Sequence, residues 1–159
     1  MKFRIVENRL PIAGRLIYSV DDYAFSTEPH PEDCATSVSI NELELMLNGK
    51  DGRVVFVTGY CPHTGWQSST LIPPPVRHRG HLYAMLDKDI VHGASKSLQP
   101  PNERWPVLVD QSTGWVRLGK GEPDKDRVGI EFAPGAIAVL AGDQLVAIWL
   151  HPDQSAPKR

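Results

Sequence analysis

The stretch AIAVLAGDQLVAIWL, residues 136–150, decides the fold class of this chain. It contains two nearly continuous apolar runs, 136–140 and 144–150, on either side of the turn sequence Ala141-Gly142-Asp143. Apolar runs of this length, bounded by turn residues, are typical of strands that lie in the centre of a core. We therefore expect a central hairpin here, with the rest of the chain built around it.

The segments before this hairpin also have the composition of strands. Each is short, rich in β-branched, aromatic or aliphatic residues, and bounded by Gly, Pro or Asp. The clearest are 15–20, 53–58 and 81–86, together with the pair 105–109 and 115–118, which flanks a loop of hairpin length. A sheet of several strands follows from this pattern.

Prolines mark the loops between these strands, because proline lacks a backbone donor and fixes φ. Three such loops are at His30-Pro31, 73–75 and 100–101. The sequence therefore predicts a mainly β fold, either all-β or β-rich α+β. We expect one compact barrel- or sandwich-like domain over 1–151, followed by a flexible C-terminal tail, 152–159.

The sequence SINELELMLNG, residues 39–49, is compatible with two structures. Its first four residues have the form of a capping box, three apolar side chains fall on one helical face, and Asn-Gly ends the segment, which favours one short helix near 40–48. Its leucines also alternate with glutamates, which favours a strand followed by a hairpin turn at 50–52. We expect the helix and retain the strand as the alternative.

The composition excludes several functional classes. The chain has 159 residues, 41% of them hydrophobic, which suffices for a core without cross-links. Its 17 basic and 19 acidic residues give a net charge of −2 without long runs of one sign, so neither a nucleic-acid nor a membrane partner is expected. We expect a soluble, bacterial-type cytoplasmic protein, because the chain lacks a secretory signal and a membrane-spanning apolar stretch and its cysteines, Cys34 and Cys61, need no disulfide.

The segment after the strand at 53–58 carries the most chemically reactive side chains. Its sequence GYCPHTGW, residues 59–66, combines a thiol, an imidazole, a phenol and an indole, and two more histidines follow. This C-x-H and H-x-x-H pattern could hold one zinc or iron ion through Cys61, His63, His78 and His81. Residues three apart on a strand point to opposite faces, so this hypothesis requires a turn at Arg79-Gly80.

The sequence CPHTG, residues 61–65, resembles the first ligand loop of Rieske iron–sulfur domains, in which a C-x-H pair is followed by C-x-x-H. The resemblance implies a cluster held by two thiolates and two imidazoles. However, no cysteine follows Cys61, and His78 stands where the second thiolate is expected. The standard cluster cannot form from this segment, which leaves a mononuclear site as the metal hypothesis.

Cys61 has two further interpretations. It could be a catalytic nucleophile that His63 activates and that Asp87 or Asp89 helps to orient. Alternatively, it is a small buried hydrophobe at the end of a strand, in which case His78 and His81 are ordinary surface residues.

Aromatic and basic side chains in the same region favour a binding site. Tyr60 and Trp66 could form a ligand-facing rim, because amphipathic rings at strand ends are suited to that role. Arg77 and Arg79 could contact an anionic group on the ligand. Two other rings, Trp115 and Trp149, are expected to cap the core.

These observations favour a binding module over a catalyst of known type. We expect a small-ligand- or protein-binding module, with a small molecule or a protein as its partner. The alternative is a mononuclear Cys/His metal-binding protein or metalloenzyme that uses the loop 60–81. The sequence does not decide whether the chain is an enzyme.

Overall fold

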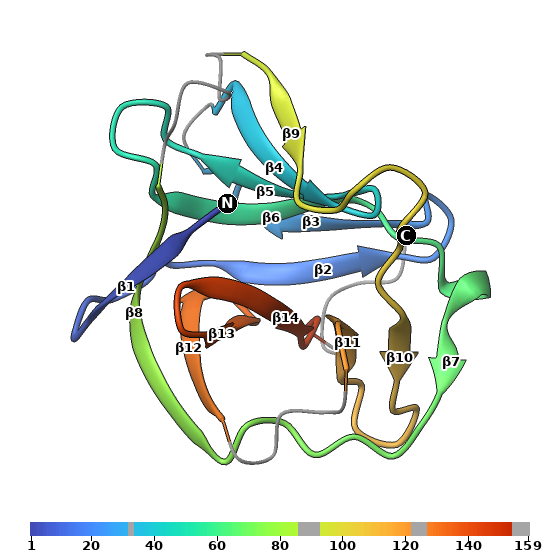
Figure 1. Cartoon of the computed structure of the whole chain (residues 1–159). Coiled ribbons are helices and arrows are strands. Elements are labelled where there is room, and N and C mark those ends of the chain that lie inside the picture. The colour runs from blue at the N-terminus through green and yellow to red at the C-terminus, as the bar shows by residue number, and fades with distance from the viewer. Residues whose placement is uncertain (32–33, 86–92, 122–126, 154–159) are drawn as a thin grey trace.

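Two mixed β-sheets lie face to face and share a core (Figure 1). The computed structural model describes residues 1–31, 34–85, 93–121 and 127–153, without the side chains of Val76 and Arg77. Within these ranges the only helical element is one 3-10 turn, η1 (His63–Gly65). The mainly β fold is confirmed, and the strands described do not close into a barrel.

The larger sheet has eight strands and the smaller has six. In spatial order, the larger contains β1 (Phe3–Glu7), β8 (Val76–Ala84), β12 (Val128–Ala133), β13 (Ala136–Ala141), β14 (Gln144–Leu150), β11 (Val116–Gly119), β10 (Val107–Val109) and β7 (Gln67–Ser68). The smaller contains β2 (Arg15–Ser19), β3 (Ala24–Glu28), β6 (Val54–Tyr60), β5 (Leu43–Leu47), β4 (Thr36–Ile40) and β9 (Ser95–Ser97). No helix in the described ranges is long and apolar enough to cross a lipid bilayer.

The stretch 136–150 forms the expected hairpin, β13–β14, in the middle of the larger sheet. Its side chains alternate between two cores. The main core, between the sheets, takes Ala136, Ala138, Ile148 and Leu150, whereas an outer core on the other face takes Ile137, Val139, Ala147 and Trp149. Because both faces of the hairpin are buried, both sets of alternating positions are apolar, which explains the nearly continuous runs.

The outer core is covered by the segment 69–75, which connects β7 to β8 (Figure 1). Leu71 in this segment is only 4% exposed and packs in the outer core. The backbone N–H of Leu71 donates to the Asp110 carboxylate at 3.0 Å, and this bond is the main reason why the pKa of Asp110 lies below its ordinary value. Asp110 therefore fastens the covering segment to the end of β10.

The other strands predicted from composition are present as well. The expected strands at 15–20 and 53–58 correspond to β2 and β6. The one at 81–86 overlaps the second half of β8, which ends at Ala84, and its last residue lies outside the described residues. The predicted hairpin at 105–118 forms from β10 and β11, which pair antiparallel.

The helix predicted near 40–48 is wrong, because this segment contributes to the hairpin β4–β5. All three leucines of β5 are 0% exposed, and β5 pairs on its other edge with β6. A strand buries every second side chain, so it buries all three leucines, whereas a helix would turn the middle one away. The alternative of a strand with a turn after it is correct, since the N–H of Gly52 bonds the carbonyl of Asn48 at 2.8 Å.

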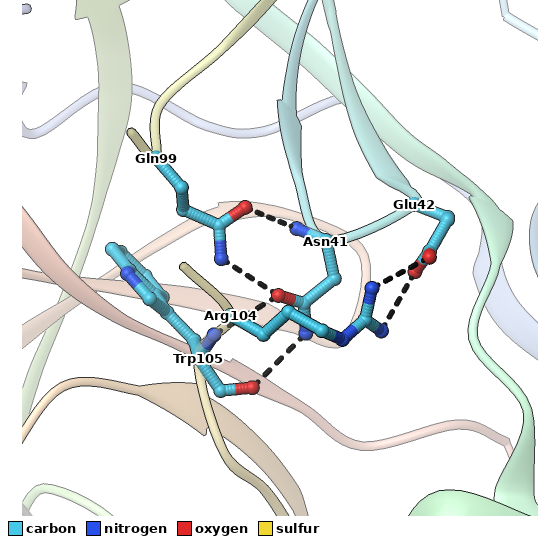
Figure 2. A network of polar contacts seen from close by, with 5 residues as sticks. All are labelled: Asn41, Glu42, Gln99, Arg104 and Trp105. Atoms are coloured by element: carbon cyan, nitrogen blue, oxygen red, sulfur yellow. Dashed lines mark hydrogen bonds and ion pairs between the residues drawn. The ribbon is translucent and has the colours of Figure 1, made fainter. Parts of the chain in front are cut away.

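Asn41, in the turn between β4 and β5, joins the smaller sheet to the segment that enters β10 (Figure 2). Its Oδ1 accepts from the N–H of Trp105 at 3.0 Å and from Nε2 of Gln99 at 2.6 Å, and its Nδ2 donates to the Trp105 carbonyl at 3.0 Å. Beside it, Arg104 makes a two-pronged ion pair with Glu42 at 2.6 and 2.9 Å. One amide thus fixes the backbone of Trp105 from both sides.

We expect Asn41→Ala to lower the free energy of unfolding by about 2–3 kcal/mol, because partly buried groups of Trp105 and Gln99 lose their partners. Asn41 also has φ 53°, a left-handed conformation that alanine disfavours. Asn41→Gly should recover about 1 kcal/mol of the loss, because glycine adopts this φ without strain. Urea unfolding of the two variants measures both effects. Equal stability of Asn41→Ala and the unchanged protein would contradict the role of this amide.

Candidate functional site

Six rings gather where β6 ends, and we call this group the aromatic rim. Its members are Tyr18, Tyr23, Phe25, Tyr60, His63 and Trp66. The chain leaves β6 at Tyr60 and turns into η1, which stacks the His63 ring on Tyr23 with 5.3 Å between centroids and 12° between planes. The sequence-predicted residues Tyr60 and His63 therefore lie in one cluster with Trp66.

The Tyr18 hydroxyl stabilises the turn between β6 and η1 through two hydrogen bonds to its backbone. It donates to the Cys61 carbonyl at 2.7 Å and accepts from the N–H of His63 at 2.9 Å. Burial raises the pKa of Tyr18 to about 12, although the bond from His63 acts in the opposite direction. A neutral phenol is what this position needs, because only the protonated oxygen can donate to a carbonyl.

Trp66 and Tyr60 have different environments in the aromatic rim. Trp66 packs against the main core, 4.8 Å from the Tyr18 ring and 6.1 Å from the Phe25 ring between centroids. Tyr60 is 50% exposed and Tyr23 is 39% exposed. The ligand-facing role of Tyr60 and Trp66 stays a prediction, but the exposed ring surface comes from the two tyrosines and Trp66 mainly supports them.

Cys61 is buried, and its environment opposes nucleophilic chemistry. Burial raises the pKa of its thiol to about 11, while the Trp66 indole acts in the opposite direction. That indole N–H reaches hydrogen-bonding geometry with no acceptor among the described residues, so its effect on the thiol is weak. Asp87 and Asp89, the carboxylates considered as orienting groups, lie outside the described residues. The surroundings of Cys61 match the interpretation as a small buried hydrophobe.

The four residues of the metal hypothesis are not brought together. His78 and His81 both belong to β8, which continues without a turn through Arg79 and Gly80, so the turn that the hypothesis required does not form. The His81 ring bonds the Leu10 carbonyl through Nε2 at 3.1 Å, whereas His63 belongs to the aromatic rim. Among the described residues, no three His, Cys, Asp or Glu side chains are arranged as metal ligands.

A pocket of about 300 Å³ lies beside the outer core, and it contains two of the predicted residues, His78 and Arg79. Strands β8, β12 and β13 supply most of its wall, and the turn between β12 and β13 adds one residue. The other two residues lie directly before β11 and directly after β14. The full lining is His78, Arg79, Trp115, Glu131, Gly135, Ile137 and His151. The side chain of Arg77, the other predicted anion contact, lies outside the described part of the chain.

The parallel pairing of β8 with β12 sets the charges in the pocket. Its register places Arg79 opposite Glu131, and Nε of the guanidinium lies 3.5 Å from Oε1 of the carboxylate. The Arg79 side chain is 67% exposed and that of Glu131 is 34% exposed. An ion pair with this much exposure contributes little to stability, so the arginine remains able to bind a ligand.

His151 and Trp115 form the aromatic wall of the pocket, with 4.6 Å between ring centroids and 36° between ring planes. Nε2 of His151 lies 3.0 Å from the Thr113 carbonyl, and a carbonyl only accepts, so the hydrogen is on Nε2. In the neutral ring Nδ1 is then the nitrogen that can accept a proton.

Gly135 fixes the backbone of His151. It follows Pro134 in the tight turn between β12 and β13 and has φ 65°. Its carbonyl accepts a hydrogen bond from the N–H of His151 at 2.8 Å. A Cβ on Gly135 would lie 2.7 Å from the His151 carbonyl oxygen. The close approach of turn and chain therefore requires glycine.

Several pocket residues were missed by sequence reasoning. Trp115 was expected to cap the core, and it packs on the outer core but also lines the pocket. Glu131 and His151 were not singled out, although a lone carboxylate in an apolar strand and a histidine directly after the central hairpin were visible in the sequence. Trp149 is 0% exposed, as expected of a core residue.

Comparison of the chain with models of known protein families and with curated proteins gives no match. The geometry of the pocket and of the aromatic rim is therefore what indicates the function.

We expect the Cys61 thiol to react at least 100-fold more slowly than a small free thiol. Its pKa of about 11 leaves about one thiol in a thousand ionised at about pH 8, and burial restricts access further. The reaction rate of a Cys34→Ser variant with dithiodipyridine measures this directly. The rate should rise about tenfold per pH unit below pH 11, because the thiolate is the nucleophile. Urea should restore ordinary reactivity, and fast reaction of the folded protein would contradict the assignment.

Proposed function

We propose that this chain is a small-ligand-binding protein and that the pocket lined by Trp115 and His151 is its binding site. The observation that supports this most strongly is the convergence of an aromatic pair and an ion pair on one concave surface. Binding sites for small molecules combine an apolar or aromatic wall with a few polar groups in this way.

The size of the pocket supports the same proposal. Its volume of about 300 Å³ lies at the lower end of the range found for ligand sites, which suits a ligand of roughly one ring. Ile137 contributes apolar surface from β13 and is itself only 4% exposed, so it is held in place by the outer core. A ring placed against Trp115 and Ile137 would leave its substituents near Arg79 and Glu131.

The aromatic rim supports binding less strongly. It exposes Tyr23 and Tyr60, but their rings lie 6.3 Å apart at 65°, so they do not form a single flat platform. The pocket offers a ligand contacts on several sides, and contact on several sides is what gives a small molecule useful affinity.

The test uses three probes of matched size: benzoate, benzamide and benzylamine. Fragments this small bind with dissociation constants of about 1 mM, so NMR titration of the tryptophan indole signals is the suitable measurement. We expect at least one probe to shift the Trp115 indole signal. Trp115→Ala should then weaken binding at least tenfold, whereas Tyr60→Ala in the aromatic rim should leave it unchanged.

Two results would contradict the proposal. One is that none of the probes binds, and the other is that Tyr60→Ala abolishes binding while Trp115→Ala retains it. Because Trp115 also packs on the outer core, its variant could unfold. In that case, shifts of the His151 ring signals in the unchanged protein locate the probe without any substitution.

A further inference from the structure

The charged and titratable groups around the pocket indicate what charge a ligand carries. Arg79 and Glu131 have opposite charges and lie 3.5 Å apart, so they largely cancel each other. The remaining titratable side chains in the lining are His78 and His151, both of which can only add positive charge. The balance therefore favours an anion.

The surroundings of His151 are suited to a protonated ring. Nε2–H already donates to the Thr113 carbonyl at 3.0 Å, and this hydrogen bond becomes stronger when the donor is charged. The ring also lies 4.6 Å from the Trp115 ring, whose π-electrons attract a cation. Both contacts stay in place when Nδ1 gains a proton.

The carboxylates near His151 are already paired with arginines, so a bound ligand is left to supply a negative charge to the protonated ring. Asp153, two residues further along, lies 3.8 Å from Arg15 in an ion pair. Glu131 is the carboxylate in the pocket lining, and it is engaged by Arg79. The loop with Thr113 and the turn with Gly135 approach His151 through backbone carbonyls, which carry no net charge.

On the basis of the proposed function, we infer that the ligand is a small carboxylate and that His151 takes up a proton from solvent when the carboxylate binds. The carboxylate supplies the negative charge that makes the protonated ring favourable. One proton moves from the buffer to Nδ1 of His151, and no covalent bond of the ligand changes. A neutral amide of the same shape would not drive this uptake, and an amine would be repelled by the protonated ring.

Calorimetry of benzoate binding in two buffers with different ionisation enthalpies tests this inference, because the difference in measured heat gives the number of protons taken up. Near neutral pH we expect uptake of a sizeable fraction of one proton per benzoate. Benzoate should bind about tenfold more tightly than benzamide, and its affinity should rise as the pH falls from about 8 to about 6.

His151→Gln isolates the role of the ring nitrogen. Glutamine can still donate to the Thr113 carbonyl but cannot take up a proton, so uptake should vanish, and benzoate affinity should fall about tenfold more than benzamide affinity. His81→Gln is the matched control, because His81 bonds Leu10 instead of lining the pocket, and it should behave like the unchanged protein.

The outcomes separate this inference from the proposed function. If benzamide binds as tightly as benzoate, if benzoate binds without proton uptake, or if uptake is lost in His78→Gln but not in His151→Gln, the inference is wrong and the ligand-binding function stands. If none of the three probes binds, both are wrong.

Discussion

The burial of both faces of the β13–β14 hairpin is the constraint on which the rest of the structure depends. Trp149 and Ile148 are neighbours in β14, and both are 0% exposed although they belong to different cores. Burying such side chains contributes about 1.5–3 kcal/mol each, but only if each face has a cover. The smaller sheet covers one face and the segment 69–75 covers the other.

Arg117 is buried beside this hairpin, where it donates to the Lys120 carbonyl at 3.1 Å and lies 6.0 Å from the Trp149 ring.

The candidate pocket is a consequence of this arrangement. The outer core needs Trp115 and Ile137 as part of its apolar surface, and the same two side chains line the pocket beside it. Gly135 lies in the turn between β12 and β13, and its carbonyl accepts a hydrogen bond from the N–H of His151, the first residue after β14. This bond places the His151 ring against Trp115. The groups that would bind a ligand are thus held by contacts that also stabilise the fold, and such preorganisation favours binding.

Local patterns in the sequence were sufficient for most strands but not for the pocket. The hairpin at 136–150 was predictable because its apolar runs and its turn are contiguous. The helix predicted near 40–48 was wrong because capping-type residues also occur in tight turns, and pairing with β6 is a non-local effect that the segment itself does not reveal. The metal hypothesis joined residues by spacing alone, whereas β8 runs straight through Arg79. Arg79 and Glu131 meet through a parallel register between distant segments, which no short motif encodes.

Two neighbouring residues of similar size, Leu71 and Ile72, allow the contribution of the covering segment to the free energy of unfolding to be measured. Leu71 is 4% exposed in the outer core, whereas Ile72 is 64% exposed. Leu71→Ala should lower the free energy of unfolding by about 2–5 kcal/mol, because it opens a cavity beside Trp149. Ile72→Ala should change it by no more than about 0.5 kcal/mol. Equal effects of the two substitutions in urea unfolding would show that the segment 69–75 does not cover the hairpin, and would remove the basis for the pocket beside it.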